Sequence, residues 1–319
     1  MRPTGKLHLG HLVGALDNWV RLQNDYECFY CIVDWHALTT HYDSTAGIRE
    51  AIIDNAVDWL AAGLDPKRST LFIQSHVMEH AELHLLLSMI VPLPWLERVP
   101  TYKEQMTEIK DHDLNTYGFL GYPLLQSADI LIYKANAVPV GADQVAHIEL
   151  TREVARRFNF LYNEEVFPEP QTLLTEVPKL PGTDGRKMSK SYGNTIALSE
   201  KPEVMKEIVR NMVTDPARVR RTDPGNPDIC PVGDYHDVFS DKNRVAEVDQ
   251  GCRTAGIGCV QCKMWLFDSL QQRLGPFYEK RQQLESQPDV VMDILNDGSK
   301  KAKQVAGETM VEVRKAMKI

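Results

Sequence analysis

The sequence lacks the features that mark membrane-spanning, secreted and nucleic-acid-coating proteins. It has no apolar run of about 18 residues, and no secretory leader precedes its first helical pattern. Only six of its 319 residues are cysteine, and its formal net charge is −8. We therefore expect a cytoplasmic protein that does not coat nucleic acid indiscriminately, although this charge is compatible with a local basic face. With 43% hydrophobic and 25% charged residues, the chain can bury a large core and form two domains.

A short segment near the amino terminus reads His8-Leu9-Gly10-His11 and opens a helical pattern. The apolar residues that share one face of that helix are Leu12, Ala15, Leu16, Trp19 and Val20. Helix N-termini carry free backbone N–H groups, and glycine lets a ligand approach the backbone closely. The segment is therefore suited to holding phosphate, although such a string taken alone is most often only a helix start.

A second segment, Lys187 to Ser191, reads KMSKS and follows a turn between Gly182 and Gly185. Two lysines and two hydroxyls within five residues suit a mobile clamp for a triphosphate leaving group. Taken alone, the segment would be an ordinary solvated turn. The order and separation of the two segments favour an ATP-binding function for both.

Short apolar runs alternate with amphipathic helical patterns through the first half of the chain. The runs at 29–33, 70–74 and 137–140 predict strands, and the apolar face at 48–60 predicts a helix that Gly63 and Pro66 close. Gly141 to Gln144 then leads into a helix that reaches 158. This alternation predicts an α/β fold with a Rossmann-like, doubly wound parallel sheet, which binds ligands at the strand carboxyl ends.

The two motifs together resemble the HIGH and KMSKS motifs of class I aminoacyl-tRNA synthetases. The segment GYPLLQSADILIYKANAVPVGADQVAHIELTREVARRFN, at 121–159, closely resembles bacterial tryptophanyl-tRNA synthetases. So do CIVDWHALT at 31–39 and the closing SKKAKQVAGETMVEVRKAM, so the resemblance covers nearly the whole chain. It implies the HUP-type synthetase fold with a C-terminal helical domain, and a homodimer that loads tryptophan onto tRNA(Trp) with ATP and Mg²⁺.

The resemblance also implies roles for individual residues. Tryptophan would be bound by His36, Tyr122, Asp129 and Gln144, with Asp129 accepting the indole N–H. The residues matching catalytic positions are His8, His11, Lys187 and Lys190. ATP would be held by Arg2, Pro3, Thr4, Gly10, His11, Gly141, Ala142, Asp143, Lys187, Met188, Ser189, Lys190 and Ser191. Gln126 departs from the family, where many members have a hydrophobic residue, and HLGH is closer to the general class I form than the T-I-G-N common in this family.

Two of these residues also have structural interpretations. Asp129 could cap or pair within a helix, but an unpaired carboxylate in the apolar stretch Ala128-Asp129-Ile130-Leu131 would be costly, which favours a binding function. A site built to pair a polar group rejects analogues lacking it by roughly 10⁴-fold or more. His36 could be an ordinary hydrogen-bonded core histidine.

The cysteines fall into two groups. Cys28 and Cys31 lie at the edge of a predicted buried strand and are expected to be core thiols. In the second half, the spacing C-x21-C-x6-C-x2-C indicates a metal site, because disulfides are disfavoured in a reducing cytosol. Its members are Cys230, Cys252, Cys259 and Cys262. Zinc and an iron–sulfur cluster both use four thiolates; a subset of tryptophanyl-tRNA synthetases has a very similar spacing that binds a [4Fe-4S] cluster, which favours the cluster here.

The expected domains are a catalytic domain at 1–198, a helical anticodon-binding domain with the four cysteines at 199–297, and a closing helix at 298–319. We expect a loop at 222–235, a helix at 260–274, and Ser299 as the cap of the closing helix, which would pack back on the catalytic domain. The arginines at 210, 218, 220 and 221 form either an RNA-binding face or a solvated one.

Class I synthetases lead into the HIGH motif from a strand, whereas here only Met1 to Lys6 precede the motif. The resemblance therefore leaves open what supplies this strand and whether the chain is fully active. Competing functions are tyrosyl-tRNA synthetase, a non-catalytic tRNA-binding paralogue and a related nucleotidyltransferase.

Overall fold

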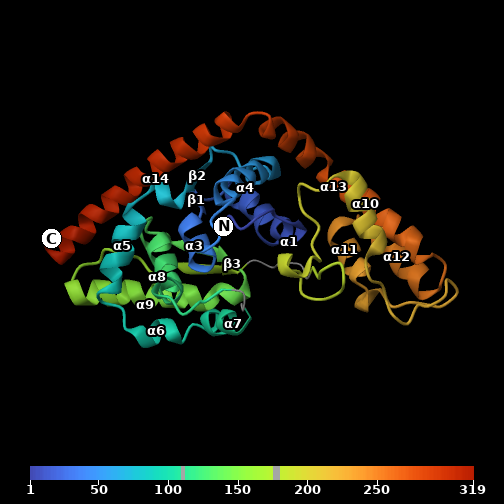
Figure 1. Ribbon diagram of the computed structural model, residues 1–319, viewed down its shortest axis with the longest axis horizontal. Helices are drawn as coiled ribbons and strands as arrows, with labels where there is room; N and C mark the ends of the chain where they lie inside the picture. Colours follow the sequence, from blue (N-terminus) through green and yellow to red (C-terminus); the bar gives the residue numbers. More distant parts are fainter. Residues whose placement is uncertain (109–111, 175–179) are drawn as a thin grey trace.

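The computed structural model describes residues 1–108, 112–174 and 180–319. Figure 1 shows the strands near the middle of one half, with helices on both sides of them. The helices α10, α11 and α12 gather at the other end, and α13 and α14 form an arc that joins the two parts along one edge. The described chain is thus an α/β half followed by a helical half.

Four strands form two parallel pairs in the described residues. Residues of β1 (Cys28–Ile32) pair with β2 (Ser69–Ile73), and β3 (Ala137–Val140) pairs with β4 (Gln171–Leu174). The predicted parallel arrangement is confirmed, and the first three strands lie within one residue of their predicted bounds. The fourth was not predicted, because only four residues pair and the preceding FPEP reads as loop.

Helices cover these strands in the order expected for strand and helix alternation. The helix α4 (Ile48–Ala62) ends at Gly63, whose φ of 115° is a left-handed conformation that glycine adopts without strain. The other helices of this half are α3 (Asp34–His41), η2 (Gln74–His76), α5 (Glu79–Ser88), α6 (Leu93–Glu97), α7 (Pro100–Glu108), α8 (Tyr117–Leu131), η3 (Ala142–Gln144) and α9 (Val145–Tyr162).

The helical half begins after η4 (Lys190–Tyr192). Its helices are α10 (Pro202–Asn211), η5 (Pro227–Ile229), α11 (Pro231–Phe239), α12 (Lys242–Arg253), α13 (Cys259–Glu285) and α14 (Pro288–Met317). The loop expected at 222–235 is partly wrong, because α11 begins at Pro231, where proline is compatible with the first turn of a helix. None of the helices in the described part of the chain is long and apolar enough to cross a bilayer.

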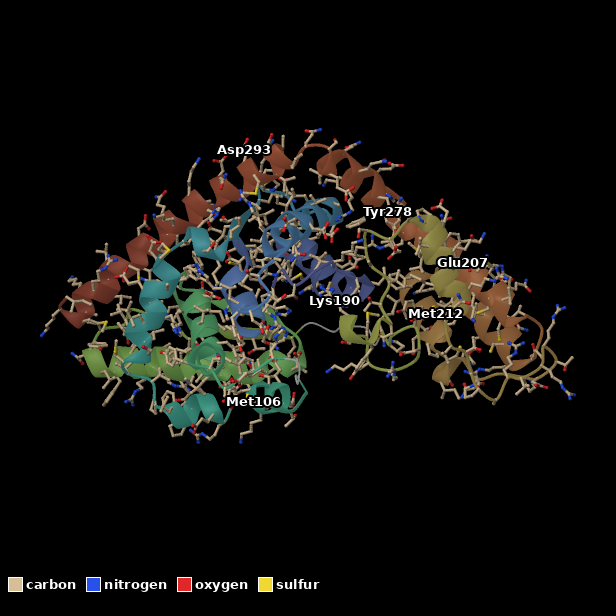
Figure 2. All side chains as sticks on the ribbon, viewed as in Figure 1. Met106, Lys190, Glu207, Met212, Tyr278 and Asp293 are labelled. Atoms are coloured by element: carbon tan, nitrogen blue, oxygen red, sulfur yellow. The ribbon has the colours of Figure 1, made fainter. Side chains whose placement is uncertain are left out.

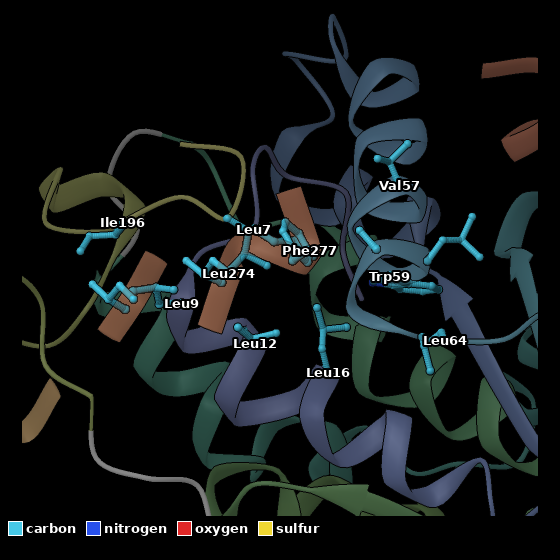
Figure 3. Packing of buried hydrophobic residues seen from close by; sticks show 14 of the residues in the cluster. Leu7, Leu9, Leu12, Leu16, Val57, Trp59, Leu64, Ile196, Leu274 and Phe277 are labelled. Carbon is cyan, nitrogen blue, oxygen red and sulfur yellow. The ribbon is translucent and has the colours of Figure 1, made fainter. Parts of the chain in front are cut away.

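The HLGH segment opens a helical run with an unusual middle. The turn α1 (Leu9–His11) continues into a π-helical turn, η1 (Leu12–Leu16), and then into α2 (Asp17–Leu22). Leu12 and Leu16 are buried, as the predicted apolar face requires. Figure 3 shows them packing with Trp59 of α4 and Phe277 of α13, so this run is held by both halves of the molecule.

Met1 extends the pairing of β1. Its amino group donates to the Cys31 carbonyl (2.5 Å), and its carbonyl accepts from the Val33 N–H (3.0 Å), which is the pattern of a residue in a parallel strand. A cavity of about 350 Å³ lies between β1 and β3 and is lined by residues of both strands. Met1 therefore lies beside the carboxyl end of β1, and the two strand pairs have open space between them.

The last two helices are longer than predicted. The helix expected at 260–274 extends to Glu285, although Pro276 lies inside it. Ser299 is not a cap: it lies within α14, where its hydroxyl donates to the Leu295 carbonyl (2.7 Å) and accepts from Ile73 N–H (3.4 Å). The expected domain boundary after 297 falls inside this helix. The predicted contact face on the α/β half is present, since Ala302, Ala306, Met310 and Val313 are fully buried.

A buried ion cluster joins α13 to α4. The Arg281 guanidinium, itself buried, pairs with Asp54 and Asp58 of α4 and with Glu285 of its own helix (2.9 Å). Burial raises the pKa of Asp58 to about 7, against the lowering effect of Arg281. Removing one partner of such a cluster would leave an uncompensated buried charge, so the cluster fixes how these two helices sit.

Gly298 provides a test of how closely α14 approaches β2. A Cβ at this position would lie 1.9 Å from the Leu71 carbonyl oxygen, so α14 must move away in the Gly298→Ala variant. We expect a loss of about 2 kcal/mol of stability. Gly307 of the same helix has nothing within 4 Å of its Cβ position, and Gly307→Ala should stabilise by about 0.5–1 kcal/mol. Unfolding by heat or denaturant measures both; equal effects would contradict the close approach.

Candidate functional site

The two motif segments lie against each other. The Leu9 N–H donates to the Ile196 carbonyl (3.0 Å), and the Leu198 N–H donates to the Leu7 carbonyl (2.8 Å), which forms a short antiparallel bridge. A Cβ on Gly10 would lie 3.0 Å from the Met188 sulfur, so the KMSKS segment packs closely on HLGH at this glycine. The structure thus brings together two segments that the sequence places nearly a domain apart.

Lys190 connects the KMSKS segment to the loop before HLGH. Its ammonium donates to the carbonyls of Thr4 (3.1 Å) and Gly5 (3.0 Å). Figure 2 shows Lys190 between the α/β half and the helical half. Neutral carbonyls hold the ammonium in place without cancelling its positive charge, so it can pair with an anionic ligand.

The two histidines of HLGH form a neutral pair. Their ring centroids lie 3.8 Å apart, and the backbone N–H of His8 donates to His11 Nδ1 (3.1 Å). Burial and the neighbouring Lys190 charge lower the pKa of His8 to about 4. Burial, His8 and Lys190 lower the pKa of His11 to about 3. Both imidazoles are therefore uncharged near pH 7 in the free protein and can donate N–H hydrogen bonds to a phosphate.

Asn194 organises the KMSKS loop, although the sequence analysis did not select it. Its side-chain oxygen accepts from the Ser189 N–H (2.8 Å), and its amide donates to Asp184 (2.8 Å) and to the Lys187 carbonyl (3.1 Å). Its backbone carbonyl also accepts from Thr183 N–H (2.9 Å). One side chain thus ties both ends of the loop together. Lys187 itself is exposed, and the side chain of Ser191 lies outside the described residues.

A cavity of about 330 Å³ lies beside β1 and contains the predicted tryptophan-binding residues. His36, Tyr122, Asp129 and Gln144 all line it, and they come from α3, α8 and the end of η3. The other lining residues are Met1, Arg2, Val33, Thr39, Gln105, Gln126 and His147. Four residues selected by resemblance therefore converge on one space. Gln126 contributes a polar wall, and Arg2, predicted to touch ATP, reaches this cavity.

Asp129 has a dense set of hydrogen-bond donors. Its carboxylate accepts from His36 Nε2 (2.9 Å), His80 Nδ1 (2.7 Å) and Gln74 Nε2 (2.8 and 2.9 Å to the two oxygens). Burial acts to raise the pKa of Asp129, but the hydrogen bonds from His36 and His80 outweigh it and hold the pKa well below its ordinary value. The carboxylate is therefore ionised and oriented before any ligand binds. It does not cap a helix.

On another wall of the cavity, Thr101 joins two polar residues. Its hydroxyl lies 2.9 Å from the Tyr122 hydroxyl and 2.6 Å from His147 Nε2. Burial lowers the pKa of His147 to about 4, so this imidazole is neutral. These hydrogen bonds fix the Tyr122 hydroxyl at the cavity wall, where it can bond a polar group of a ligand.

The GADQ turn, Gly141 to Gln144, follows β3 directly. The Gln144 amide donates to Asp143 (2.7 Å), and a Cβ on Gly141 would approach the other Asp143 oxygen to 2.8 Å. The turn therefore needs a small residue at 141 and leaves Ala142 and Asp143 at the carboxyl end of the strand, where parallel sheets bind ligands.

The sequence analysis missed four residues of this site: Gln74, His80, Thr101 and Asn194. A usable signal existed for Gln74, because it directly follows a buried strand, and for Asn194, because it closes the KMSKS loop after Gly193. His80 and Thr101 gave none, since each acts through a residue distant in sequence. Some residues of the site can thus be recognised from the local sequence, and others only from tertiary contacts.

The four cysteines of the helical half lie near one another. Burial, followed by the nearby Cys230, Cys252 and Cys259, raises the pKa of Cys262 to about 12. Arg218 lies 3.7 Å from the Cys252 sulfur and also donates to the Ile257 carbonyl. Within residues 1–108, 112–174 and 180–319, however, no three histidine, cysteine or acidic side chains are arranged as metal ligands. Of the first pair, Cys28 is buried in β1, as expected for a core thiol, and Cys31 is half-buried.

Comparison with known proteins defines the family. The family model for class I tRNA synthetases (W and Y) matches residues 1–275. The chain belongs to this family. It is 57% identical over 321 residues to the tryptophan–tRNA ligase of Thermotoga maritima, and the match covers 100% of this chain and 98% of that protein. It is 48% identical to the tryptophan–tRNA ligase of Ralstonia nicotianae, with 99% and 96% covered.

The fold of this synthetase-family chain matches a solved structure over its whole length. The tryptophanyl-tRNA synthetase of Campylobacter jejuni, complexed with ADP and tryptophan, has a TM-score of 0.90 at 30% identity. The match covers 100% of this chain and 98% of that one. The class I synthetase fold with a helical C-terminal part, expected from the sequence, is therefore confirmed.

Asn194 allows a test of the loop that carries the two lysines. Replacing Asn194 by alanine removes three hydrogen bonds within the KMSKS loop, each worth about 1 kcal/mol. We expect kcat/KM for ATP in ATP–pyrophosphate exchange to fall roughly tenfold or more, because the lysines are no longer held in position. The KM for the amino acid should stay the same. Asn243→Ala, on the exposed face of α12, serves as the control; an equal loss in both variants would contradict the role.

Proposed function

We propose that the chain is a tryptophan–tRNA ligase. It would activate L-tryptophan with ATP to form tryptophanyl-AMP and pyrophosphate, and then transfer the tryptophanyl group to tRNA(Trp). The observation that carries this proposal is the ionised Asp129 carboxylate in a cavity of about 330 Å³ next to the joined HLGH and KMSKS segments. The names of the relatives, and the tryptophan and ADP bound in the C. jejuni protein, support it.

Asp129 would provide the selection for tryptophan. Indole carries one N–H donor, and a buried carboxylate is a strong acceptor for it. A phenylalanine side chain would leave this acceptor without that partner, which is the basis for strong rejection. Tyr122 and Gln144 would hold the ammonium and carboxylate groups of the amino acid, and His36 would line the indole pocket.

The first reaction needs positioning and charge balance. A carboxylate oxygen of tryptophan attacks the α-phosphorus of ATP, a bond forms between them, and the bond to the pyrophosphate oxygen breaks. Lys190 and Lys187, with Mg²⁺, would balance the charge on the leaving pyrophosphate. The neutral His8 and His11 would donate hydrogen bonds to the phosphates. In the second reaction a ribose hydroxyl of tRNA takes the acyl group, and AMP leaves.

The other predicted ATP contacts fit the same site. The loop of Arg2, Pro3 and Thr4 and the glycine at position 10 adjoin the KMSKS segment. Gly141, Ala142 and Asp143 lie at the end of β3, where Asp143 would bind ribose hydroxyls. Met188, Ser189 and Ser191 complete the loop that would close over the triphosphate.

We also propose the working assembly. Residues 1–198 would form the catalytic domain and 199–297 the domain that reads the anticodon of tRNA(Trp). The segment 298–319 would pack back on the catalytic domain, as the buried face of α14 supports. By family resemblance, the protein would act as a homodimer in the cytoplasm.

A metal centre in the helical half is the remaining part of the proposal. Cys230, Cys252, Cys259 and Cys262 would ligate a [4Fe-4S] cluster, with Zn²⁺ as the alternative. Their proximity supports this, but among the described residues these side chains are not arranged for ligation, so the group would have to rearrange around the metal. The centre would support the helical half and would take no part in the reaction.

Tryptophan-dependent ATP–pyrophosphate exchange tests the activity. Wild-type protein should exchange pyrophosphate with tryptophan and show much less exchange with tyrosine. Asp129→Ala should lose roughly 10³-fold or more of kcat/KM for tryptophan, because the buried donors around it then lack their acceptor. Exchange with tyrosine but not tryptophan would indicate a tyrosyl-tRNA synthetase. Binding of tRNA without any exchange or charging would indicate a non-catalytic paralogue.

Absorbance and metal analysis of anaerobically purified protein test the metal centre. A [4Fe-4S] cluster should give a broad brown absorption near about 400 nm, about four iron atoms per chain, and loss of both in Cys230→Ser. Cys28→Ser, outside the four-cysteine group, is the control and should keep the colour. Colourless protein with one zinc per chain would indicate a zinc site in place of the cluster. Protein without either metal would contradict the proposed metal centre.

A further inference from the structure

The Asp129 carboxylate receives most of its hydrogen bonds from behind the cavity. Gln74 and His80 contact it, are 0% exposed, and do not line the cavity. Of its three donor residues, only His36 faces the cavity. Asp129 therefore stands between a fully buried donor set and the space where a ligand would bind.

The direction of the buried hydrogen bonds follows from the chemistry of each group. An ionised carboxylate only accepts, so His80 must donate from Nδ1 to Asp129 (2.7 Å). In a neutral imidazole the other nitrogen, Nε2, then accepts, and it lies 2.7 Å from the Tyr133 hydroxyl. Burial raises the pKa of Tyr133, so that hydroxyl keeps its proton and can donate it. The order is Tyr133 O–H to His80, and His80 N–H to Asp129.

The Tyr133 ring is itself held in place. It stacks on Phe29 of β1 with 4.7 Å between ring centroids, and it meets Phe72 of β2 edge-on at 5.5 Å. Two strands thus fix the ring, the ring fixes its hydroxyl, and the hydroxyl selects which nitrogen of His80 carries the proton. Metal- and substrate-binding groups are often oriented in this way, by residues that contact the binding group but not the ligand.

The carboxylate has little acceptor capacity left. Its two oxygens offer roughly four lone-pair sites, and Gln74 and His80 already make three contacts with them. The remaining contact is His36 Nε2 on Oδ2. An indole N–H entering the cavity would therefore be received at Oδ2, at the position that His36 now occupies.

On the basis of the proposed tryptophan-activating function, we propose that Tyr133 and His80 are positioning residues for tryptophan selection. The Tyr133 hydroxyl fixes the His80 tautomer, and His80 with Gln74 holds Asp129 so that Oδ2 faces the indole N–H. Neither residue touches the ligand. Their effect should therefore appear only with ligands that carry the N–H group.

The first test is Tyr133→Phe, which removes the hydroxyl and keeps the ring that packs on Phe29. In ATP–pyrophosphate exchange, the KM for tryptophan should rise about tenfold with kcat nearly unchanged. The KM for an analogue with sulfur in place of the indole N–H should not change. Tyr30→Phe is the matched control, because its hydroxyl bonds the Trp19 carbonyl, and it should alter neither KM. An equal rise for both ligands in Tyr133→Phe, or no rise, would overturn the positioning role.

A pair of substitutions at His80 gives a second, independent readout. His80→Asn keeps an N–H donor near the position of Nδ1, whereas His80→Leu removes it. Discrimination between tryptophan and the sulfur analogue should be partly retained in the asparagine variant and lost in the leucine variant. Equal behaviour of the two variants, with thermal unfolding midpoints like that of the wild type, would contradict the role. Wild-type protein that does not activate tryptophan would instead overturn the proposed function itself.

Discussion

The architecture of the nucleotide side depends on one short backbone pairing, between Leu7–Leu9 and Ile196–Leu198. Leu7, Leu9, Ile196 and Leu198 are buried and belong to a single apolar cluster that also includes residues of α4 and α13. The bridge includes His8 of HLGH and lies shortly after KMSKS, so it brings the two motifs together, and the hydrogen bonds of Asn194 then order the KMSKS loop. The Lys190 ammonium and the two histidines are thereby placed on a rigid support, and groups positioned in advance stabilise developing charge most effectively.

The second constraint is the cost of placing a carboxylate in an apolar helix. Asp129 lies among Ala128, Leu131 and other buried residues of α8, where an ion without partners would be strongly destabilising. The surrounding donors offset this cost, and they do so from three separate elements of the fold. The charge therefore has a structural consequence as well as a binding one, because α3, η2 and α5 all converge on it.

Much of the fold could be predicted from the sequence, because local sequence patterns indicate its helices, strands and turns. The buried strands of the first half are short apolar runs, α4 is a 3.6-residue pattern ended by Gly63, and the GADQ turn follows its strand at once. The convergence of His36, Tyr122, Asp129 and Gln144 on one cavity was predicted by resemblance. Neither periodicity nor composition would have paired His36 with Asp129, since these residues lie on different helices.

The features that could not be predicted are those set by tertiary contacts. Gly298-Ser299 reads locally as a helix start, but in the fold glycine is there because α14 crosses the Leu71 carbonyl, and the serine hydroxyl bonds within the helix. No local sequence pattern predicts the π-helical turn after HLGH. The Tyr133–His80 hydrogen bond joins the turn after α8 to α5, and no local sequence pattern pairs these two residues.

The position of α14 also has a consequence for how this chain is made. The strand β2 packs against α14, and its Ile73 bonds Ser299, which lies 226 residues later in the sequence. During synthesis the Leu71 backbone and its apolar neighbours therefore stay uncovered until α14 has been made and has left the ribosome. Contacts of such long sequence separation form slowly. Docking of α14 is thus a late step of folding, and the α/β half exposes part of its core until this helix is in place.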